Sequence, residues 1–175
     1  MSEVNYGDEL LPKYFFDRLT DITPRDLKEM GALAVAIDID NTIADDGALH
    51  LFHGVRAWVK QIREAGFGVI ILTNTFPLRA KFIAHLLGGI PYVAKAEKPK
   101  SRGFLKAAAI LGVPVEKLAM VGDQLFTDIK GANNVGAIPV RIKYNRPEVL
   151  LYFHYKKLRS KEKNYLTSKG YGDKT

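Results

Sequence analysis

The chain has 175 residues, of which 47% are hydrophobic, so it can bury one well-formed core but has little room for a second independent domain. The absence of cysteine excludes disulfides, thiolate metal sites and cysteine nucleophiles. The formal net charge is +7, and all of the excess lies at one end of the chain. Residues 141–175 contain ten Lys and Arg against three Asp and Glu, whereas residues 1–140 contain 16 of each sign.

No apolar run is long enough to span a bilayer, and the opening stretch, MSEVNYGDELLPKYFF, lacks the basic-then-apolar layout of a secretory signal. We therefore expect a cytoplasmic protein, either soluble or peripheral on the inner face of the membrane. The basic end indicates an anionic partner, which is either an acidic membrane surface or nucleic acid. The alternative is a solvated helix end that only aids solubility.

Residues 1–31 are expected to form a lead-in that packs on the core. It contains a short helix, with Thr23 as its N-cap, Pro24 as its first residue and Gly31 near its end. Buried-strand patterns then alternate with helical patterns. The strands are expected at 32–38, 67–73, 90–95, 117–123 and 137–142, and the helices at 53–66, 77–89, 101–112 and 125–136.

This alternation is typical of the α/β class. It predicts a Rossmann-like, doubly wound parallel sheet of about five strands over residues 32–142, with helices on both faces. Residues 143–175 form a basic tail. Within it, 146–163 is expected to be a basic helix with an apolar face, and 164–175 is expected to fray.

Polar residues stand at or just after the ends of the predicted strands, where a parallel sheet binds its ligands. They are Asp38, Thr73, Lys98 and Asp123. Carboxylates crowd together when a cation holds them, and oxygen ligands without His or Cys favour Mg²⁺. A carboxylate can attack phosphorus, while a lysine and a hydroxyl neutralise the phosphoryl oxygens. A second acid, Asp40, could protonate the leaving oxygen and then activate water. The set therefore predicts a phosphoryl-transfer site.

Four motifs carry a family resemblance. DIDNT (38–42) matches the DxDxT signature of the haloacid dehalogenase (HAD) superfamily of phosphatases. LTN (72–74), KPK (98–100) and GDQLFTD (122–128) resemble its second, third and fourth motifs, and they occur in the family's order. The resemblance covers roughly residues 32–142 and implies a HAD fold.

The resemblance implies a metal-assisted nucleophile. Asp38 would be the nucleophile and a Mg²⁺ ligand, and Asp40 would be the general acid and base and would offer its backbone carbonyl to the ion. Asp123 would be the third protein ligand, with Asp128 in support. The alternatives are that Asp40 and Asn41 are ordinary turn residues and that Asp128 is an exposed charge on a helix.

The resemblance also implies a phosphate-binding set. Thr73 and Lys98 would hold the phosphoryl oxygens, with Asn74 as an alternative or additional contact. Lys95 and Lys100 compete with Lys98 for the third motif, and Lys98 is preferred because it directly precedes Pro99.

The spacing of the motifs leaves no room for a cap domain, since 43–54 is a short loop and 75–97 is used up by a helix and a strand. A site without a lid suits a large substrate or a lid borrowed from a neighbouring subunit. The lead-in, KPK and GDQLFTDI look most like the capless subclass IIIA branch that includes phosphatidylglycerophosphate phosphatases. One departure is LTNTFP, where that branch more often has a serine and two asparagines.

The resemblance to this branch implies a lipid head group as the substrate, in phosphatidylglycerol synthesis, and the basic tail would then dock on an anionic membrane. We expect that deleting residues 146–175 weakens vesicle binding and largely spares the hydrolysis of a soluble ester. The alternatives are a phosphatase of nucleic-acid ends or of a small phosphorylated metabolite, and a non-catalytic module that binds phosphate or RNA. The sequence leaves the oligomeric state open.

Overall fold

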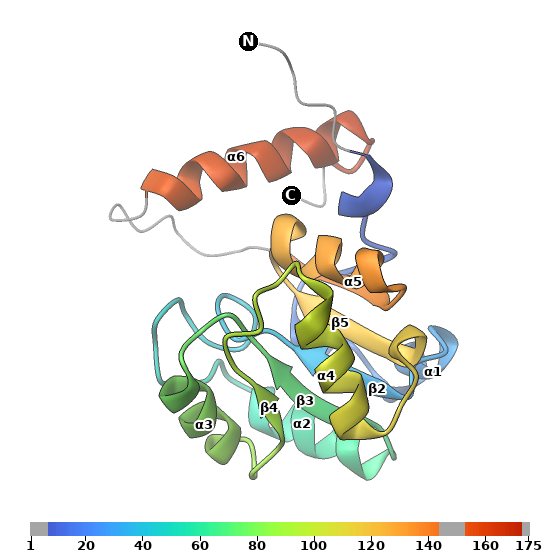
Figure 1. Cartoon of the computed structure of the whole chain (residues 1–175), viewed down its shortest axis with the longest axis vertical. Helices are drawn as coiled ribbons and strands as arrows, with labels where there is room; N and C mark the ends of the chain where they lie inside the picture. Colours follow the sequence, from blue (N-terminus) through green and yellow to red (C-terminus); the bar gives the residue numbers. More distant parts are fainter. Residues whose placement is uncertain (1–6, 144–152, 173–175) are drawn as a thin grey trace.

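The computed structural model describes residues 7–143 and 153–172, and its centre is a parallel sheet (Figure 1). The six strands lie in the order β1-β6-β5-β2-β3-β4, and every neighbouring pair is parallel. Their bounds are β1 (Tyr14–Phe16), β2 (Ala34–Ile37), β3 (Gly68–Leu72), β4 (Tyr92–Val93), β5 (Leu118–Gly122) and β6 (Ile138–Ile142). From β2 the chain adds β3 and β4 on one side and then β5 and β6 on the other, with β1 at the outer edge beside β6, so the strand order reverses between β2 and β5.

The five strands expected from the sequence are confirmed, and the sheet has one strand more. β1 comes from the lead-in and pairs with β6, with Tyr14 opposite Val140. All three of its residues are half-buried, so the strand shows neither the alternating burial of a one-sided strand nor the full burial of a central one. A segment this short carries no clear strand pattern. The edge of β6 is what holds this segment extended.

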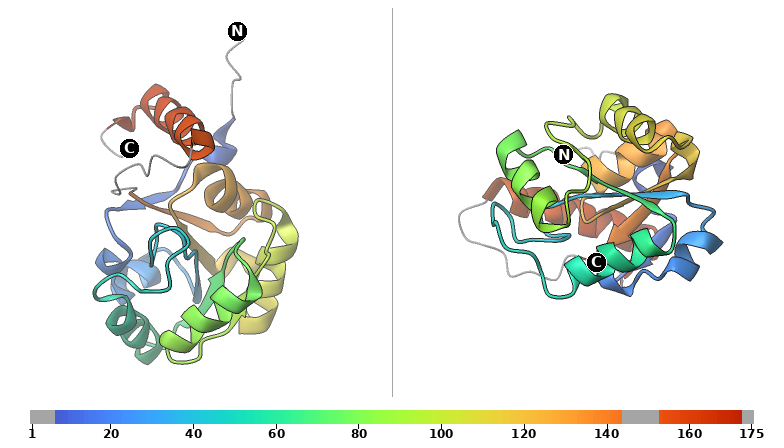
Figure 2. Two further views of the ribbon diagram at one scale, coloured as in Figure 1. Left: turned by 90° about the vertical axis from the view of Figure 1, so that its left-hand side faces the viewer. Right: turned by 90° about the horizontal axis from the view of Figure 1, so that it is seen from below.

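Helices cover both faces of the sheet (Figure 2). On one face lie α1 (Pro24–Glu29), α2 (Val55–Glu64) and α3 (Pro77–Leu86), and on the other lie α4 (Ser101–Leu111) and α5 (Lys130–Val135). The residues of β2 alternate between them: Val35 and Ile37 pack in the first core, and Ala34 and Ala36 in the second. A strand buried on both faces has to be apolar at every position, as ALAVAI is.

The ends of the short helices follow the sequence signals. The Thr23 hydroxyl accepts a hydrogen bond from Asp26 N at 3.2 Å, and the Asp26 carboxylate accepts one from Thr23 N at 2.7 Å, which completes a capping box for α1. Single turns of 3-10 helix connect other segments: η1 (Asp8–Leu10), η2 (Leu19–Asp21) and η3 (Val115–Lys117).

The helix expected over 125–136 is divided. It begins as a π-helical turn, η4 (Leu125–Ile129), and continues as α5. Gly131 in α5 lies against the ring of Phe104 from α4 so closely that a Cβ there would overlap it. The glycine therefore allows α5 to pack closely against α4.

The basic tail contains one described helix, α6 (Phe153–Ser168), which lies at the end of the sheet above η4 and α5 (Figure 1). The expectation that 164–175 frays is wrong for 164–168, because Tyr165 and Leu166 are buried against Leu10, Leu125 and Ile129. The expected helical residues 146–152 lie outside the described part.

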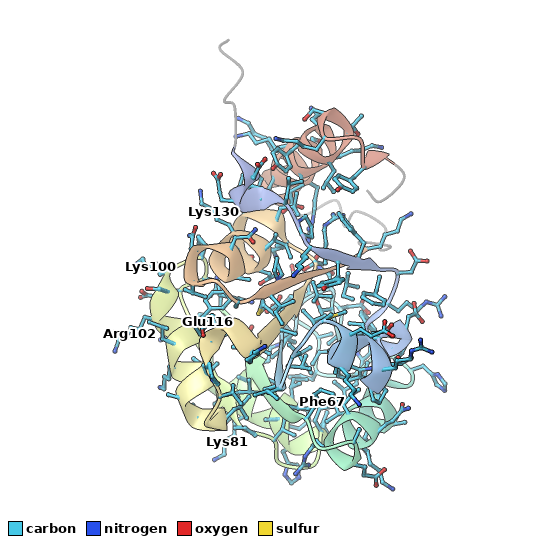
Figure 3. The ribbon with its side chains drawn as sticks, turned by 90° about the vertical axis from the view of Figure 1, so that its right-hand side faces the viewer. Phe67, Lys81, Lys100, Arg102, Glu116 and Lys130 are labelled. Carbon is cyan, nitrogen blue, oxygen red and sulfur yellow. The ribbon has the colours of Figure 1, made fainter. Side chains whose placement is uncertain are left out.

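Lys100 and Arg102, at the start of α4, point outward from the molecule (Figure 3). Glu116, in η3, is exposed as well. Among the described residues, no helix combines the length and apolar character needed to cross a membrane.

Candidate active site

Three carboxylates meet at the carboxyl ends of β2 and β5. Asp38 follows β2, and its N–H still donates to the carbonyl of Val121 in β5 at 3.0 Å, which keeps the two strand ends in register. Asp123 follows β5, and Asp128 lies on η4. All three are buried, and one carboxylate oxygen from each lies within 4.8 Å of the others. Like charges this close repel one another unless cations balance them.

Lys98 is one such cation. Its Nζ donates to Asp38 Oδ1 at 2.8 Å and to Asp128 Oδ1 at 2.6 Å. Burial alone would lower the pKa of Lys98, but the carboxylates of Asp128 and Asp38 raise it above its ordinary value, so the ammonium stays charged. The competing lysines lie elsewhere: the Lys95 ammonium is over the ring of Phe76, and Lys100 pairs with Glu97.

Asn74, after β3, fixes the backbone of Lys98. Its Oδ1 accepts a hydrogen bond from Lys98 N at 2.8 Å, and its Nδ2 donates to Lys98 O at 3.1 Å. The neighbouring Thr73 is buried, and its hydroxyl accepts a hydrogen bond from Thr75 N at 3.2 Å. That contact leaves the hydroxyl proton available to a further acceptor. Phosphate binding by Thr73 and Asn74 stays a prediction.

Asp40 has partners of its own. Arg79, on α3, lies 2.7 Å from its Oδ1, and Gly47 N donates to the same oxygen at 3.1 Å. Arg79 also donates to the carbonyls of Ala48 and Asp45, so it ties the loop after Asp40 to α3. Burial and the nearby Asp38 raise the pKa of Asp40, and Arg79 acts against them. Sequence reasoning did not find Arg79, whose position in the first turn of α3 carries no motif.

Asp123 has one anchored oxygen and one without a partner. Its Oδ1 is buried and has no hydrogen-bond partner among the described residues, whereas its Oδ2 pairs with Arg159. Burial raises the pKa of Asp123 to about 8, with Arg159 opposing the rise. A buried, unpartnered carboxylate oxygen beside two further carboxylates fits a hard divalent cation, which prefers oxygen ligands.

Asp128 is fully buried, so it is not the exposed helix charge that the sequence left open. Its Oδ2 accepts a hydrogen bond from Gln124 N at 3.1 Å, and its Oδ1 accepts from Lys98. Gly122 makes room for it, since a Cβ at that position would overlap the Asp128 carboxylate. The glycine of the GDQLFTD motif is therefore required by the packing of its last aspartate.

Arg159 and Glu162 reach this site from α6. Sequence reasoning missed both, because they lie in a lysine-rich stretch that has the composition of a solvated helix.

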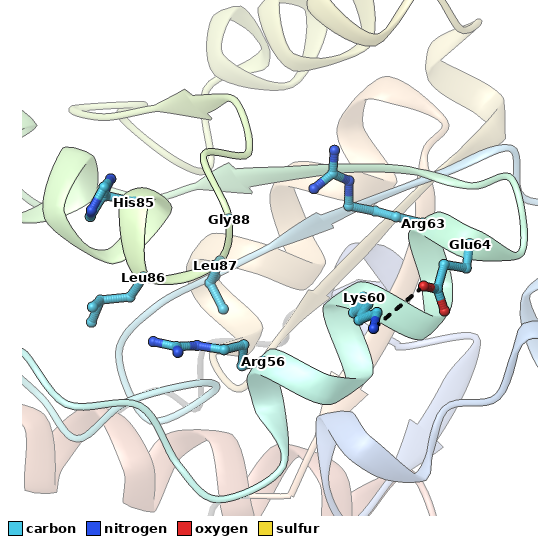
Figure 4. A pocket seen from close by; sticks show the side chains of 8 residues that line it. All are labelled: Arg56, Lys60, Arg63, Glu64, His85, Leu86, Leu87 and Gly88. Atoms are coloured by element: carbon cyan, nitrogen blue, oxygen red, sulfur yellow. Dashed lines mark ion pairs between the residues drawn. The ribbon is translucent and has the colours of Figure 1, made fainter.

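Two surface hollows differ in their position relative to the carboxylates. One, of about 690 Å³, lies between α2 and the end of α3 and is lined by Arg56, Arg63, His85 and the Lys60–Glu64 ion pair, among others (Figure 4). Because α3 runs back from the end of β3 toward the start of β4, its last residues lie at the amino end of the sheet, away from the carboxylates.

The second hollow, of about 350 Å³, borders the first motif at the carboxyl end of the sheet. Its lining includes Asn41, Thr42, Arg18, His53 and Lys143. It is the hollow of the two that adjoins the residues following Asp40.

A family model described as a haloacid dehalogenase-like hydrolase matches residues 12–136 of the chain. The chain is 32% identical over 126 residues to the probable phosphatase YqeG of Bacillus subtilis, covering 72% of this chain and 73% of that protein. It is 32% identical over 103 residues to a glyceraldehyde 3-phosphate phosphatase of Pyrococcus abyssi, covering 53% of this chain and 42% of that protein.

The chain is also 30% identical over 127 residues to the chloroplastic phosphatidylglycerophosphate phosphatase 1 of Chlamydomonas reinhardtii, covering 68% of this chain and 47% of that protein. The chain thus spans less than half the length of the Pyrococcus and Chlamydomonas proteins. Among solved structures, the cobalt-bound deoxy-D-mannose-octulosonate 8-phosphate phosphatase of Haemophilus influenzae aligns with a TM-score of 0.51 at 17% identity, over 83% of this chain and 93% of that one. This structure supports the fold alone.

Proposed function

We propose that this chain hydrolyses phosphate monoesters through a phosphoryl group carried on Asp38, with Mg²⁺ as its cofactor. The chain belongs to the haloacid dehalogenase-like hydrolases and is a phosphatase. One observation carries the proposal. The buried carboxylates of Asp38, Asp123 and Asp128 share one site with the Lys98 ammonium, while Asp40 has a separate partner in Arg79.

The residues divide the reaction between them. A carboxylate oxygen of Asp38 attacks phosphorus, and the bond to the ester oxygen breaks. Asp40, whose pKa is raised by burial, gives its proton to the departing alcohol. Asp40 then takes a proton from water, and the water oxygen attacks phosphorus, which releases phosphate and restores Asp38. Lys98 balances the negative charge of the phosphoryl oxygens throughout, and the Thr73 hydroxyl is a second donor to them.

The cation has a defined place in this proposal. Asp38, the carbonyl of Asp40 and Asp123 would hold Mg²⁺, with Asp128 in support. The ion would neutralise the crowded carboxylates and polarise the phosphoryl oxygens.

The proposed substrate is phosphatidylglycerophosphate at a membrane surface. The similarity to the Chlamydomonas phosphatase supports it. So does the spacing of the motifs, because in the described part of the chain the segments 43–54 and 75–97 hold a loop, α3 and β4 and no further domain that could form a lid. An enzyme without a lid can approach a head group that is anchored in a bilayer.

Apolar side chains near the site support the membrane proposal. Phe76 is 72% exposed and Leu78 is 82% exposed, on either side of Pro77 at the start of α3. Arg79, the next residue, contacts Asp40. Exposed apolar groups beside a catalytic site indicate contact with an apolar partner. The exposed lysines of α6 would add attraction to an anionic surface.

A second candidate is a small phosphorylated metabolite, which the similarity to the Pyrococcus glyceraldehyde 3-phosphate phosphatase favours. A lid would then come from a neighbouring subunit. Phosphorylated nucleic-acid ends are a third substrate class, and a non-catalytic phosphate-binding module is the alternative outside catalysis.

A substrate panel tests these candidates. The wild-type chain is assayed on vesicles that contain phosphatidylglycerophosphate, on glyceraldehyde 3-phosphate and on a 5′-phosphorylated oligonucleotide, each with Mg²⁺ and with a chelator. We expect Mg²⁺-dependent release of phosphate, fastest from the vesicles, and none from Asp38→Asn. Fast turnover of a soluble ester with an untouched lipid phosphate would refute the lipid substrate, and hydrolysis that survives Asp38→Asn would refute the nucleophile.

A further inference from the structure

The C-terminal helix α6 contacts the loop that follows β5 at three points. One guanidinium nitrogen of Arg159, Nη2, pairs with Asp123 Oδ2, and the other, Nη1, donates to the Asp123 carbonyl at 3.3 Å. Nη1 also donates to Glu162 Oε2 at 2.8 Å. The second oxygen of Glu162, Oε1, accepts the N–H of Leu125 at 2.7 Å. Two side chains one helical turn apart therefore hold both the side chain and the backbone of Asp123 and the first backbone N–H of η4.

This network is buried. Glu162 is 1% exposed and Asp123 is fully buried. Burying such charges is costly unless each has a partner, and here the Arg159–Glu162 pair supplies partners to the loop as well as to itself. The next turn of α6 anchors the helix, because Tyr165 and Leu166 pack against Leu125 and Ile129 of η4.

The position of Arg159 leaves the predicted metal-binding oxygen open. Arg159 occupies Oδ2 of Asp123, and Oδ1 stays buried without a hydrogen-bond partner among the described residues. Arg159 contacts Asp123 at both the carboxylate Oδ2 and the backbone carbonyl, and these two contacts fix the rotation of the side chain and therefore the direction of Oδ1. The guanidinium also offsets the repulsion that Asp38 and Asp128 exert on Asp123.

We propose that Arg159 and Glu162 form a clamp that positions Asp123 for the divalent cation, so that α6 is part of the catalytic centre. The inference rests on the proposed metal-dependent function and deepens it by adding two positioning residues. It also replaces the sequence-based expectation that the tail is dispensable for the hydrolysis of a soluble ester.

The test measures Mg²⁺ affinity by titration calorimetry on the full chain, alongside kcat and KM for a soluble phosphate ester. We expect Arg159→Met to weaken Mg²⁺ binding by about 10- to 100-fold and to lower kcat at subsaturating Mg²⁺, with a smaller effect on KM for the ester. Arg159→Lys should recover only part of the affinity, since one ammonium cannot contact Asp123 and Glu162 as a fork does.

Glu162→Gln keeps the size of the side chain but removes its negative charge and one of its two acceptor oxygens, so it can accept from Leu125 N–H or from Arg159 but not from both. It provides a second variant should Arg159→Met unfold. It is expected to weaken Mg²⁺ binding less than Arg159→Met does. Lys163→Met is the matched control: it removes an exposed positive charge from the same helix and should bind Mg²⁺ as the wild type does.

The outcomes separate the two proposals. A wild-type chain that does not bind Mg²⁺ would refute the metal-dependent function and the clamp with it. A wild type that binds Mg²⁺, together with folded Arg159→Met and Glu162→Gln variants of equal affinity, would refute the clamp alone. Tighter binding by Arg159→Met would also refute it, because Arg159 would then compete with the cation.

Discussion

The guanidinium of Arg79 lies 2.7 Å from the Oδ1 of Asp40, the proposed general acid, and is its nearest positive charge among the described residues. Arg79 lowers the pKa of Asp40, against the rise caused by burial and by Asp38. In Arg79→Met the pKa of Asp40 should therefore rise further. The general acid then stays protonated to higher pH, so the alkaline limb of the profile of kcat/KM against pH should move upward.

The same variant should lose about 10-fold in kcat, because Arg79 also orients Asp40 and the loop carbonyls of Ala48 and Asp45. Arg56→Met, which removes an exposed arginine from α2, is the control and should leave the profile in place. An unchanged alkaline limb in Arg79→Met would show that Asp40 is not the group that titrates there.

Lys98 should matter for stability as well as for activity. Its ammonium is the shared partner of Asp38 and Asp128, so Lys98→Met leaves two buried carboxylates without it. Removing one partner of a buried ion pair costs about 3–5 kcal/mol, and we expect that loss in the free energy of unfolding measured by urea denaturation.

The competing lysines serve as controls for that experiment. Lys95→Met and Lys100→Met remove exposed charges and should change the free energy of unfolding by less than about 0.5 kcal/mol, with activity retained. If Lys95→Met or Lys100→Met abolished hydrolysis while Lys98→Met retained it, the assignment of the third motif would be wrong.

Binding of the cation should stabilise the fold, since a ligand that binds only the native state raises its melting temperature. We expect Mg²⁺ to raise the Tm of the wild type and to have no such effect on Asp123→Asn, which loses a charged ligand. Asp46→Asn, an exposed carboxylate in the loop after Asp40, should respond to Mg²⁺ as the wild type does. A Tm that responds equally to Mg²⁺ in Asp123→Asn and in the wild type would place the ion elsewhere.

The sequence identified the residues whose position depends on strand ends alone. Asp38, Thr73 and Asp123 each follow an apolar run of strand length. A parallel sheet brings the carboxyl ends of its strands to one edge, independently of the conformation of the connecting loops. Lys98 was chosen from three lysines by its neighbour Pro99, and it is the one that contacts Asp38.

The residues that the sequence missed depend on tertiary docking. Arg159 pairs with Asp123 across 36 residues, and nothing in the local pattern of the tail distinguishes it from the exposed lysines around it. The strand β1 was missed for the same reason, because its extended backbone comes from pairing with β6.

The exposed apolar residues at the start of α3 give the membrane proposal a direct test. Phe76 and Leu78 flank Pro77, and Leu78 directly precedes Arg79, the partner of Asp40. Both apolar side chains are mostly exposed. The double variant Phe76→Ser, Leu78→Ser should lose binding to vesicles that contain anionic lipid, because fully burying each apolar side chain is worth about 1.5–3 kcal/mol. Hydrolysis of phosphatidylglycerophosphate in those vesicles should fall about 10-fold or more, since each 1.4 kcal/mol is a factor of ten, while hydrolysis of a soluble ester should be unchanged.

Leu105→Ser is the matched control for this experiment. Leu105 is 51% exposed on α4, on the opposite face of the sheet from α3, so its replacement removes an exposed apolar group without touching the proposed contact. Vesicle binding measured by flotation should therefore be normal in Leu105→Ser. Equal loss in both variants would mean a nonspecific effect of surface hydrophobicity, and normal binding by the double variant would leave the basic tail as the region that attaches the enzyme to the lipid.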